Sequence, residues 1–169
     1  MKIGSLFSGY EGLGIGVKAV IPDAEHAWFV EFDEAPSKIL AKHFPGVPNY
    51  GDITRVDFTK VEPVDILTGG FPCQDLSLAG KRAGLKEGTR SGLWSEFARA
   101  IEELKPRLVV IENVRGLLSA TATNPELELC SWCMGESGDG EPALRALGAV
   151  LGDLADLGYD AKWTGVRAA

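Results

Sequence analysis

Cys73 is the residue best suited to covalent chemistry. It stands in Gly69-Gly70-Phe71-Pro72-Cys73-Gln74, directly after residues 64–68, an apolar run typical of a buried strand. Ligands and chemistry gather in the loops that follow the strands of α/β proteins. The two glycines let the backbone approach a ligand closely, and Pro72 restricts the backbone before the thiol. A lone cysteine is usually a small buried hydrophobic residue, but this setting indicates a nucleophile.

A glycine-rich turn, Phe7 to Gly16, follows the first predicted strand and opens a helix. This geometry suits a nucleotide-like cofactor, with glycines serving only tight packing as the alternative. The glycines are spaced by two, so the dinucleotide fingerprint G-x-G-x-x-G does not fit. Glu31 follows the second predicted strand, where a carboxylate commonly accepts hydrogen bonds from ribose hydroxyls. The turn and Glu31 together predict a nucleotide site.

The elements that position these residues alternate between strands and helices. The pattern predicts strands at 2–7, 27–31, 47–50 (weak), 64–68, 107–111 and 159–166. Helices are expected from the glycine turn to residue 20 and at 35–43, 91–104 and 143–157. Repeated βα units predict an α/β fold with a doubly wound, mostly parallel sheet. The length of 169 residues predicts a single domain, 1–169.

Two segments interrupt this pattern. Residues 81–90 combine glycines with four cations and predict a mobile basic loop; the cations are Lys81, Arg82, Lys86 and Arg90. Residues 121–142 are polar and lack periodicity, so we expect a surface insertion there. The insertion contains Cys130 and Cys133 at C-x-x-C spacing, but no second ligand pair follows, so an ordinary loop is favoured over zinc and no metal is predicted.

Composition limits the class of protein. The net charge of −7 means that any nucleic-acid surface must be local or lie elsewhere. No run approaches the roughly 20 apolar residues of a membrane span. The three cysteines, an odd count without an export signal, predict a protein of the reducing cytoplasm rather than a disulfide scaffold.

Three motifs occur in order at suitable separations: Phe7-Ser8-Gly9, Pro72-Cys73-Gln74 and Glu112-Asn113-Val114. With them the chain resembles the catalytic part of DNA cytosine-5 methyltransferases, from about residue 3 to residue 166. The resemblance implies the Rossmann-like fold of S-adenosylmethionine-dependent methyltransferases, methylation of cytosine C5 and double-stranded DNA as partner.

The resemblance also implies roles for individual residues. Cys73 would be the nucleophile and Glu112 would face N3 of the flipped cytosine, with Pro72, Gln74 and Asn113 supporting the active site. The residues expected to bind S-adenosylmethionine are Phe7, Ser8, Gly9, Gly12, Glu31, Phe32, Asp52, Ile53, Phe71 and Leu93. The basic loop, with Lys81, Arg82, Lys86 and Arg90, would close over the DNA.

The chemistry accounts for these residue types. A thiolate that adds to C6 of cytosine makes C5 nucleophilic enough to accept a methyl group. Charge develops toward N3, where a carboxyl group stabilises the adduct. The base lies inside a duplex, so it must first be flipped out of the stack.

The chain departs from the family pattern in three places. Glu11 stands where the family usually has glycine, and Ser5 where aspartate is common, so we expect the Glu11 carboxylate near the cofactor, facing its cationic groups. The sequence stops at Ala169, before the segments expected to supply an active-site arginine, a target-recognition domain and the last strand. We therefore expect a truncated or split enzyme, completed by a carboxyl-terminal fragment or subunit, with an unpaired strand edge at 107–111.

Two other function classes stay open. One is a catalytically inactive remnant of the family that binds a cofactor or a partner. The other is a nucleotide-binding oxidoreductase, which the failed G-x-G-x-x-G spacing and Pro72-Cys73-Gln74 disfavour.

Overall fold

The computed structural model describes residues 1–71, 92–114, 117, 134–136, 142–144 and 146–166. The chain divides into two compact units. Residues 1–71 and 99–112 form the first, and the second comprises the described parts of 72–98 and 113–169. Each unit is described by itself below.

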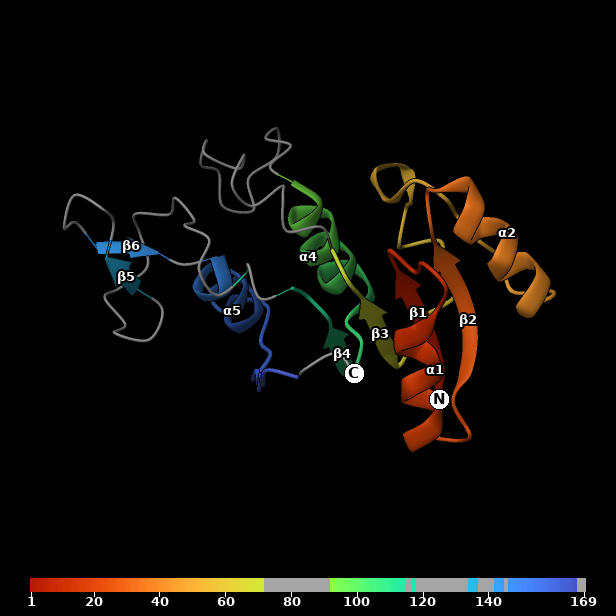
Figure 1. The fold of residues 1–169 in the computed structure, drawn as a ribbon, viewed down its shortest axis with the longest axis horizontal. Coiled ribbons are helices and arrows are strands. Elements are labelled where there is room, and N and C mark those ends of the chain that lie inside the picture. The colour runs from red at the N-terminus through yellow and green to blue at the C-terminus, as the bar shows by residue number, and fades with distance from the viewer. Residues whose placement is uncertain (72–91, 115–116, 118–133, 137–141, 145, 167–169) are drawn as a thin grey trace. The chain divides into compact units, whose positions relative to one another are not determined.

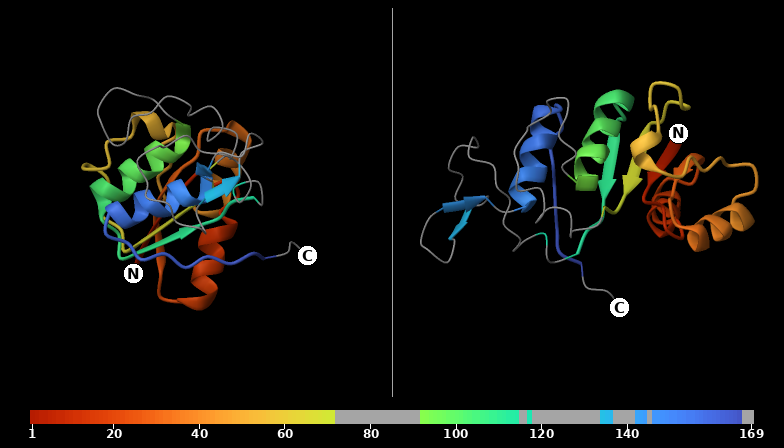
Figure 2. Two further views of the ribbon diagram at one scale, coloured as in Figure 1. Left: turned by 90° about the vertical axis from the view of Figure 1, so that its left-hand side faces the viewer. Right: turned by 90° about the horizontal axis from the view of Figure 1, so that it is seen from above.

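The first unit is built on a four-stranded parallel sheet whose order is β2-β1-β3-β4, and its four arrows point the same way in Figure 1. The strands are β1 (Lys2–Leu6), β2 (Glu25–Val30), β3 (Ile66–Gly69) and β4 (Leu108–Ile111). Leu6 pairs with Gly69, and Gly69 pairs with Ile111, so the carboxyl ends of three strands meet at one edge. This topology confirms the predicted α/β fold with a parallel sheet, which Figure 2 shows from two further directions.

Helices connect these strands. They are α1 (Gly12–Val20) after β1, α2 (Glu34–His43) after β2, and α4 (Gly92–Leu104), which leads into β4. A single 3-10 turn, η1 (Ile53–Arg55), lies between α2 and β3. Apart from the strand expected at 47–50, the predicted strands and helices of this unit thus exist, with ends shifted by one or two residues.

The core of the first unit lies on the sheet itself. On the central strands β1 and β3, the buried side chains are Ile3, Leu6, Ile66 and Leu67, as expected for a parallel sheet covered on both faces, and Trp28 on the edge strand β2 is fully buried as well. Trp28 pairs in register with Gly4, and its indole occupies the space that a side chain at position 4 would need. Gly4 is therefore required for close packing between β1 and β2.

Two predicted strands are wrong. Residues 47–50 make only one isolated bridge, between Phe29 and Asn49. The main chain around this bridge is paired, since Phe29 N donates to Pro48 O and Tyr50 N donates to Phe29 O. Pro48 has no N–H to extend the ladder, which explains why no strand forms. Residues 159–166 contain no strand either, and Trp163 and Val166 there are exposed.

The second unit contains the amino-terminal part of α4 and the whole of α5 (Ala146–Asp156). Helix α5 is shorter than the helix predicted at 143–157. Trp94 Nε1 donates to Asp153 Oδ2 at 2.6 Å, and the Trp94 and Phe97 rings stack at 5.7 Å. Burial raises the pKa of Asp153. β5 (Met134–Glu136), inside the predicted insertion, pairs antiparallel with β6 (Pro142–Leu144), so residues 143 and 144 are strand where the sequence predicts the start of a helix. No helix among the described residues is long and apolar enough to cross a membrane.

Candidate active site

A pocket of about 380 Å³ opens at the carboxyl ends of β1 and β3. Its walls come from three places along the chain: the end of β1 with the following turn and the start of α1, the end of β3 with Gly70, and the residue after β4. The lining residues are Ser5, Leu6, Phe7, Ser8, Gly12, Leu13, Gly69, Gly70 and Glu112. The pocket therefore joins the glycine turn to Glu112, two motifs that the sequence analysis singled out.

The glycine turn has an unusual backbone. Phe7, Gly9 and Glu11 all have positive φ, at 50°, 52° and 65°. Phe7 and Glu11 adopt this conformation at a cost that glycine would avoid. Ser8 is buried, and its hydroxyl donates to Ser5 O at 2.9 Å, which ties the turn to the end of β1. The turn is thus held in one shape by side-chain contacts as well as by its glycines.

Glu31 fastens the same turn to the end of β2. Its side chain accepts a hydrogen bond from Gly9 N on Oε2 and another from Asp33 N on Oε1, both at 2.7 Å. Glu31 is only 9% exposed. Each oxygen of an ionised carboxylate can accept a second hydrogen bond. Glu31 can therefore organise the turn and still accept a hydrogen bond from a bound ligand.

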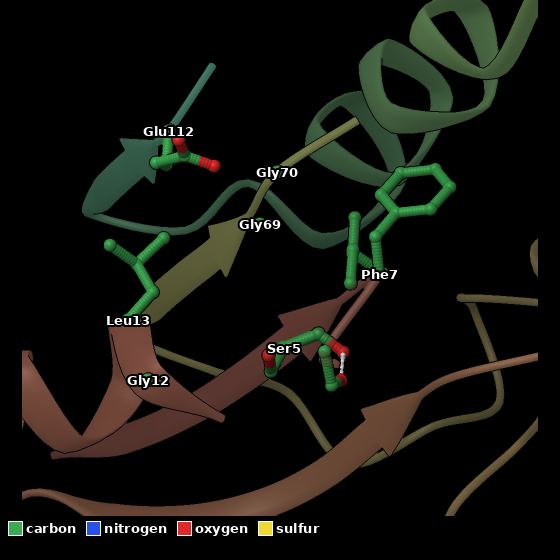
Figure 3. A pocket seen from close by; sticks show the side chains of 9 residues that line it. Ser5, Phe7, Gly12, Leu13, Gly69, Gly70 and Glu112 are labelled. Atoms are coloured by element: carbon green, nitrogen blue, oxygen red, sulfur yellow. Dashed lines mark hydrogen bonds between the residues drawn. The ribbon is translucent and has the colours of Figure 1, made fainter. Parts of the chain in front are cut away.

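Glu112 lies close to Gly70, where β3 ends, as Figure 3 shows. Its backbone N donates to Gly69 O at 3.1 Å, so the ladder between β3 and β4 continues one residue beyond β4. A Cβ at position 70 would lie 2.9 Å from Glu112 Oε2. Gly70 is therefore needed to give the Glu112 carboxylate its place at the pocket.

Of the predicted cofactor residues of this unit, only Phe7, Ser8 and Gly12 line the pocket; Gly9, Glu31, Phe32, Asp52, Ile53 and Phe71 lie outside its lining. Phe32 is 77% exposed, directly after Glu31. Asp52 caps η1, since its Oδ1 accepts from Thr54 N at 3.0 Å and from Thr54 Oγ1 at 2.8 Å. These hydrogen bonds lower the pKa of Asp52 and keep it ionised as an acceptor. Ile53 and Phe71 are buried.

Glu11 corrects one expectation. Its side chain does not line the pocket but is fully buried beside His26, with 3.4 Å between Glu11 Oε1 and His26 Nδ1. Burial raises the pKa of Glu11 from 4.5 to about 7, and burial, followed by the charge of Lys18, lowers the pKa of His26. The carboxyl group occupies space left by Gly14, which has no side chain. Glu11 is therefore an interior residue beneath the turn.

The remaining predicted site residues lie outside the described residues or in the second unit. Pro72, Cys73, Gln74 and the basic residues Lys81, Arg82, Lys86 and Arg90 lie outside the described residues, as do Cys130 and Cys133. Leu93 stands in the first turn of α4, in the second unit, and its place near the cofactor stays a prediction. Asn113 also belongs to the second unit, and its Oδ1 accepts a hydrogen bond from Val114 N at 2.8 Å.

Sequence reasoning had missed Ser5, Leu6 and Leu13 as pocket residues. The signal for Leu13 was present, because the first turn of a helix that follows a glycine turn faces the same ligand site. Ser5 was noted only as a departure from the family pattern, where aspartate is common, and Leu6 has the sequence of an ordinary strand residue.

A parallel sheet with a glycine turn after its first strand and a carboxylate after its second is an arrangement typical of α/β proteins that bind nucleotides. This chain belongs to the family of C-5 cytosine-specific DNA methylases, whose family model matches residues 1–169. The resemblance seen in the sequence is thereby confirmed.

Curated relatives and a solved structure agree. The chain is 42% identical to the Type II methyltransferase M.Eco47II of Escherichia coli over 69% of this chain and 28% of the relative. It is 32% identical to the Type II methyltransferase M.NlaIV of Neisseria lactamica over 96% of this chain and 36% of the relative. The chain thus spans about a third of the length of these relatives. A crystal structure of a Spodoptera frugiperda DNMT2 mutant superposes with a TM-score of 0.50 at 21% identity, covering 71% of this chain and 37% of that one, which supports the fold.

Proposed function

We propose that the whole protein methylates C5 of cytosine in double-stranded DNA and uses S-adenosylmethionine as methyl donor. The observation that carries the proposal is the pocket that joins the glycine turn to Glu112 across Gly70, in a chain of this family. Because the chain spans about a third of its relatives' length, the complementary carboxyl-terminal part would complete the enzyme, in the same polypeptide or as a separate fragment. The relatives' names suit a role in restriction–modification in a bacterial cytoplasm.

The residues present fit S-adenosylmethionine. A volume of about 380 Å³ lies within the range of small-molecule pockets. The first turn of α1 reaches the pocket, and Glu11, its N-cap, makes no side-chain hydrogen bond to it. Backbone N–H groups at a helix N-terminus suit a carboxylate, such as that of the methionine part. Glu31 would accept from the ribose hydroxyls, Phe32 would pack on the adenine, and Asp52 and Ile53 would meet its edge.

In the reaction, the cofactor supplies an electrophilic methyl group. Cys73, deprotonated to a thiolate, forms a bond to C6 of the flipped cytosine, and the electron pair of the C5–C6 double bond becomes available at C5. Glu112 stabilises the charge that develops toward N3 by a hydrogen bond or by giving a proton. After C5 is methylated, a base removes the C5 proton and the bond between Cys73 and C6 breaks, which restores the thiolate and the ring. Closure of the basic loop over the flipped base would exclude water.

Trapping with 5-fluorocytosine tests this chemistry, because fluorine at C5 cannot leave as a proton and the adduct cannot resolve. The whole protein, incubated with S-adenosylmethionine and duplex DNA that carries the analogue, should form a complex stable to denaturing electrophoresis. Cys73→Ser should form none. A folded protein that methylates DNA as well with serine at position 73 would refute the covalent step. A protein that binds the cofactor but never modifies cytosine would instead be an inactive family member.

A further inference from the structure

The segment 51–56 contains Asp52 and Ile53, the residues that would meet the adenine. Two side chains from other parts of the first unit form hydrogen bonds with its main chain. Its internal hydrogen bonds are all local: Arg55 N donates to Asp52 O at 3.0 Å and Val56 N to Ile53 O at 3.3 Å, beside the two from Thr54 to Asp52 Oδ1. A single 3-10 turn of this size has little stability of its own. Its position must therefore come from the rest of the first unit.

Arg99 of α4 forms hydrogen bonds with the main chain of this segment. Its guanidinium donates from Nη2 to Ile53 O at 2.9 Å and from Nη1 to Val56 O at 3.0 Å. The same group lies 5.0 Å from the centre of the Phe58 ring, and Glu103 pairs with Nη1 at 3.3 Å. Glu103 Oε2 also accepts from Phe58 N at 3.1 Å. A planar, multiply bonded guanidinium is a rigid clamp, which a lysine could not reproduce.

Asn49 holds the amino end and links it to Glu31. Its Oδ1 accepts from Glu31 N at 2.9 Å and from Gly51 N at 3.1 Å. Its Nδ2 donates to Glu31 O at 3.1 Å and to Ser37 Oγ at 3.0 Å. Through these four hydrogen bonds, the Asn49 side chain connects the end of β2, the start of α2 and Gly51. The side chain is exposed, so each bond is weak alone, but together they fix one geometry.

We propose that Arg99 and Asn49 are positioning residues that hold the segment 51–56 in register with Glu31, so that Asp52 and Ile53 read the adenine base. The inference rests on the proposed S-adenosylmethionine site and adds the residues that set its selectivity for the base. Neither residue needs to touch the ligand. Their loss would let the segment move relative to Glu31, and hydrogen-bond recognition falls steeply with such displacement.

Titration calorimetry of the chain with S-adenosylhomocysteine and with its hypoxanthine analogue, S-inosylhomocysteine, tests the proposal. The analogue lacks the exocyclic amino group, so the ratio of the two affinities reports how well the base edge is read. Arg99→Met should weaken binding of the adenine ligand roughly tenfold and lower the ratio by about threefold or more. Asn49→Ala should also lower the ratio. Asn49→Asp keeps the acceptor for Gly51 N but sets an oxygen against Glu31 O in place of the Nδ2 donor, so it should lower the ratio as well.

Two matched variants separate positioning from general destabilisation. Arg107→Met removes an exposed arginine just before β4, at the opposite end of the sheet, and Ser37→Ala removes a partner of Asn49 that does not bond to the segment 51–56. Both should keep the wild-type ratio, and Arg99→Lys serves if Arg99→Met does not fold. An unchanged ratio in folded Arg99 and Asn49 variants would overturn the positioning role while the cofactor site stands. A folded wild-type chain that binds neither ligand would overturn the proposed site and this inference with it.

Discussion

The buried pair Glu11–His26 predicts an unusual dependence of stability on pH. Burial raises the pKa of Glu11 from 4.5 to about 7, so above pH 4.5 the folded state keeps a proton that the unfolded state releases. This group therefore lowers the free energy of unfolding as pH rises toward 7. Burial lowers the pKa of His26 below 6.5, so below pH 6.5 the unfolded state binds a proton that the folded state does not. His26 therefore lowers the free energy of unfolding as pH falls.

The two contributions oppose each other below pH 6.5, so the wild-type free energy of unfolding should change less with pH there than that of a variant that keeps only one of the two groups. In Glu11→Gln, His26 is the titrating group of the pair that remains, so the free energy of unfolding should decrease as pH falls below 6.5. His26→Phe leaves Glu11 alone and can keep the ring contacts with Phe29 and Phe44. The free energy of unfolding of this variant should decrease by up to about 3 kcal/mol as pH rises from 4.5 to 7. The pKa of Glu11 lies about 2.5 above its ordinary value, and each pKa unit corresponds to about 1.36 kcal/mol.

Urea unfolding at a series of pH values, followed by circular dichroism, measures these slopes. Glu25→Gln is a matched control, because the Glu25 side chain is 73% exposed on the same strand as His26. Glu25→Gln should leave the wild-type dependence of the free energy of unfolding on pH unchanged. Profiles of equal slope in Glu11→Gln and His26→Phe, or flat profiles in both, would refute the reasoning, because each variant must expose the titration of the other group.

Three further predictions concern glycines and Glu31. Gly14→Ala would place a methyl group against the Glu11 carboxyl group and should lower the free energy of unfolding by about 3 kcal/mol. Gly16→Ala, where the added methyl group meets open space, should raise the free energy of unfolding by about 0.5–1 kcal/mol. Urea unfolding measures both, and a smaller cost of Gly14→Ala in a Glu11→Gly background would identify the carboxyl as the cause. Gly70→Ala should slow methyl transfer roughly tenfold or more with cofactor affinity nearly kept, because it displaces Glu112; unchanged single-turnover rates would contradict this. Glu31→Gln should weaken S-adenosylhomocysteine binding roughly tenfold by calorimetry, and equal affinity would exclude Glu31 from the site.

The sequence was sufficient for the main architecture of the first unit. Alternating apolar strands and amphipathic helices predicted β1 to β4 and α1, α2 and α4, and the three ordered motifs predicted that the glycine turn and Glu112 serve one site. Glycine and proline, whose backbone limits are local, marked the turns correctly. These features depend on neighbours in the chain, so a single sequence can reveal them.

Features that depend on distant partners could not be predicted. A charged residue in a turn is normally exposed, and only the packing of Gly14 and His26 around Glu11 shows why this one is buried. Arg99 reads as an ordinary surface cation of a helix, yet it bonds to carbonyls 43 and 46 residues away. Such contacts require the tertiary structure.

The packing of Trp28 on Gly4 gives the protein an internal optical reporter. Trp28 is fully buried in the sheet of the first unit, whereas Trp94 and Trp163 belong to the second. Replacing the other three tryptophans with phenylalanine would leave an emission that comes from the sheet beneath the pocket alone. Comparing that signal with the emission of Trp94 during unfolding would show whether the two units melt as one cooperative structure or in separate steps.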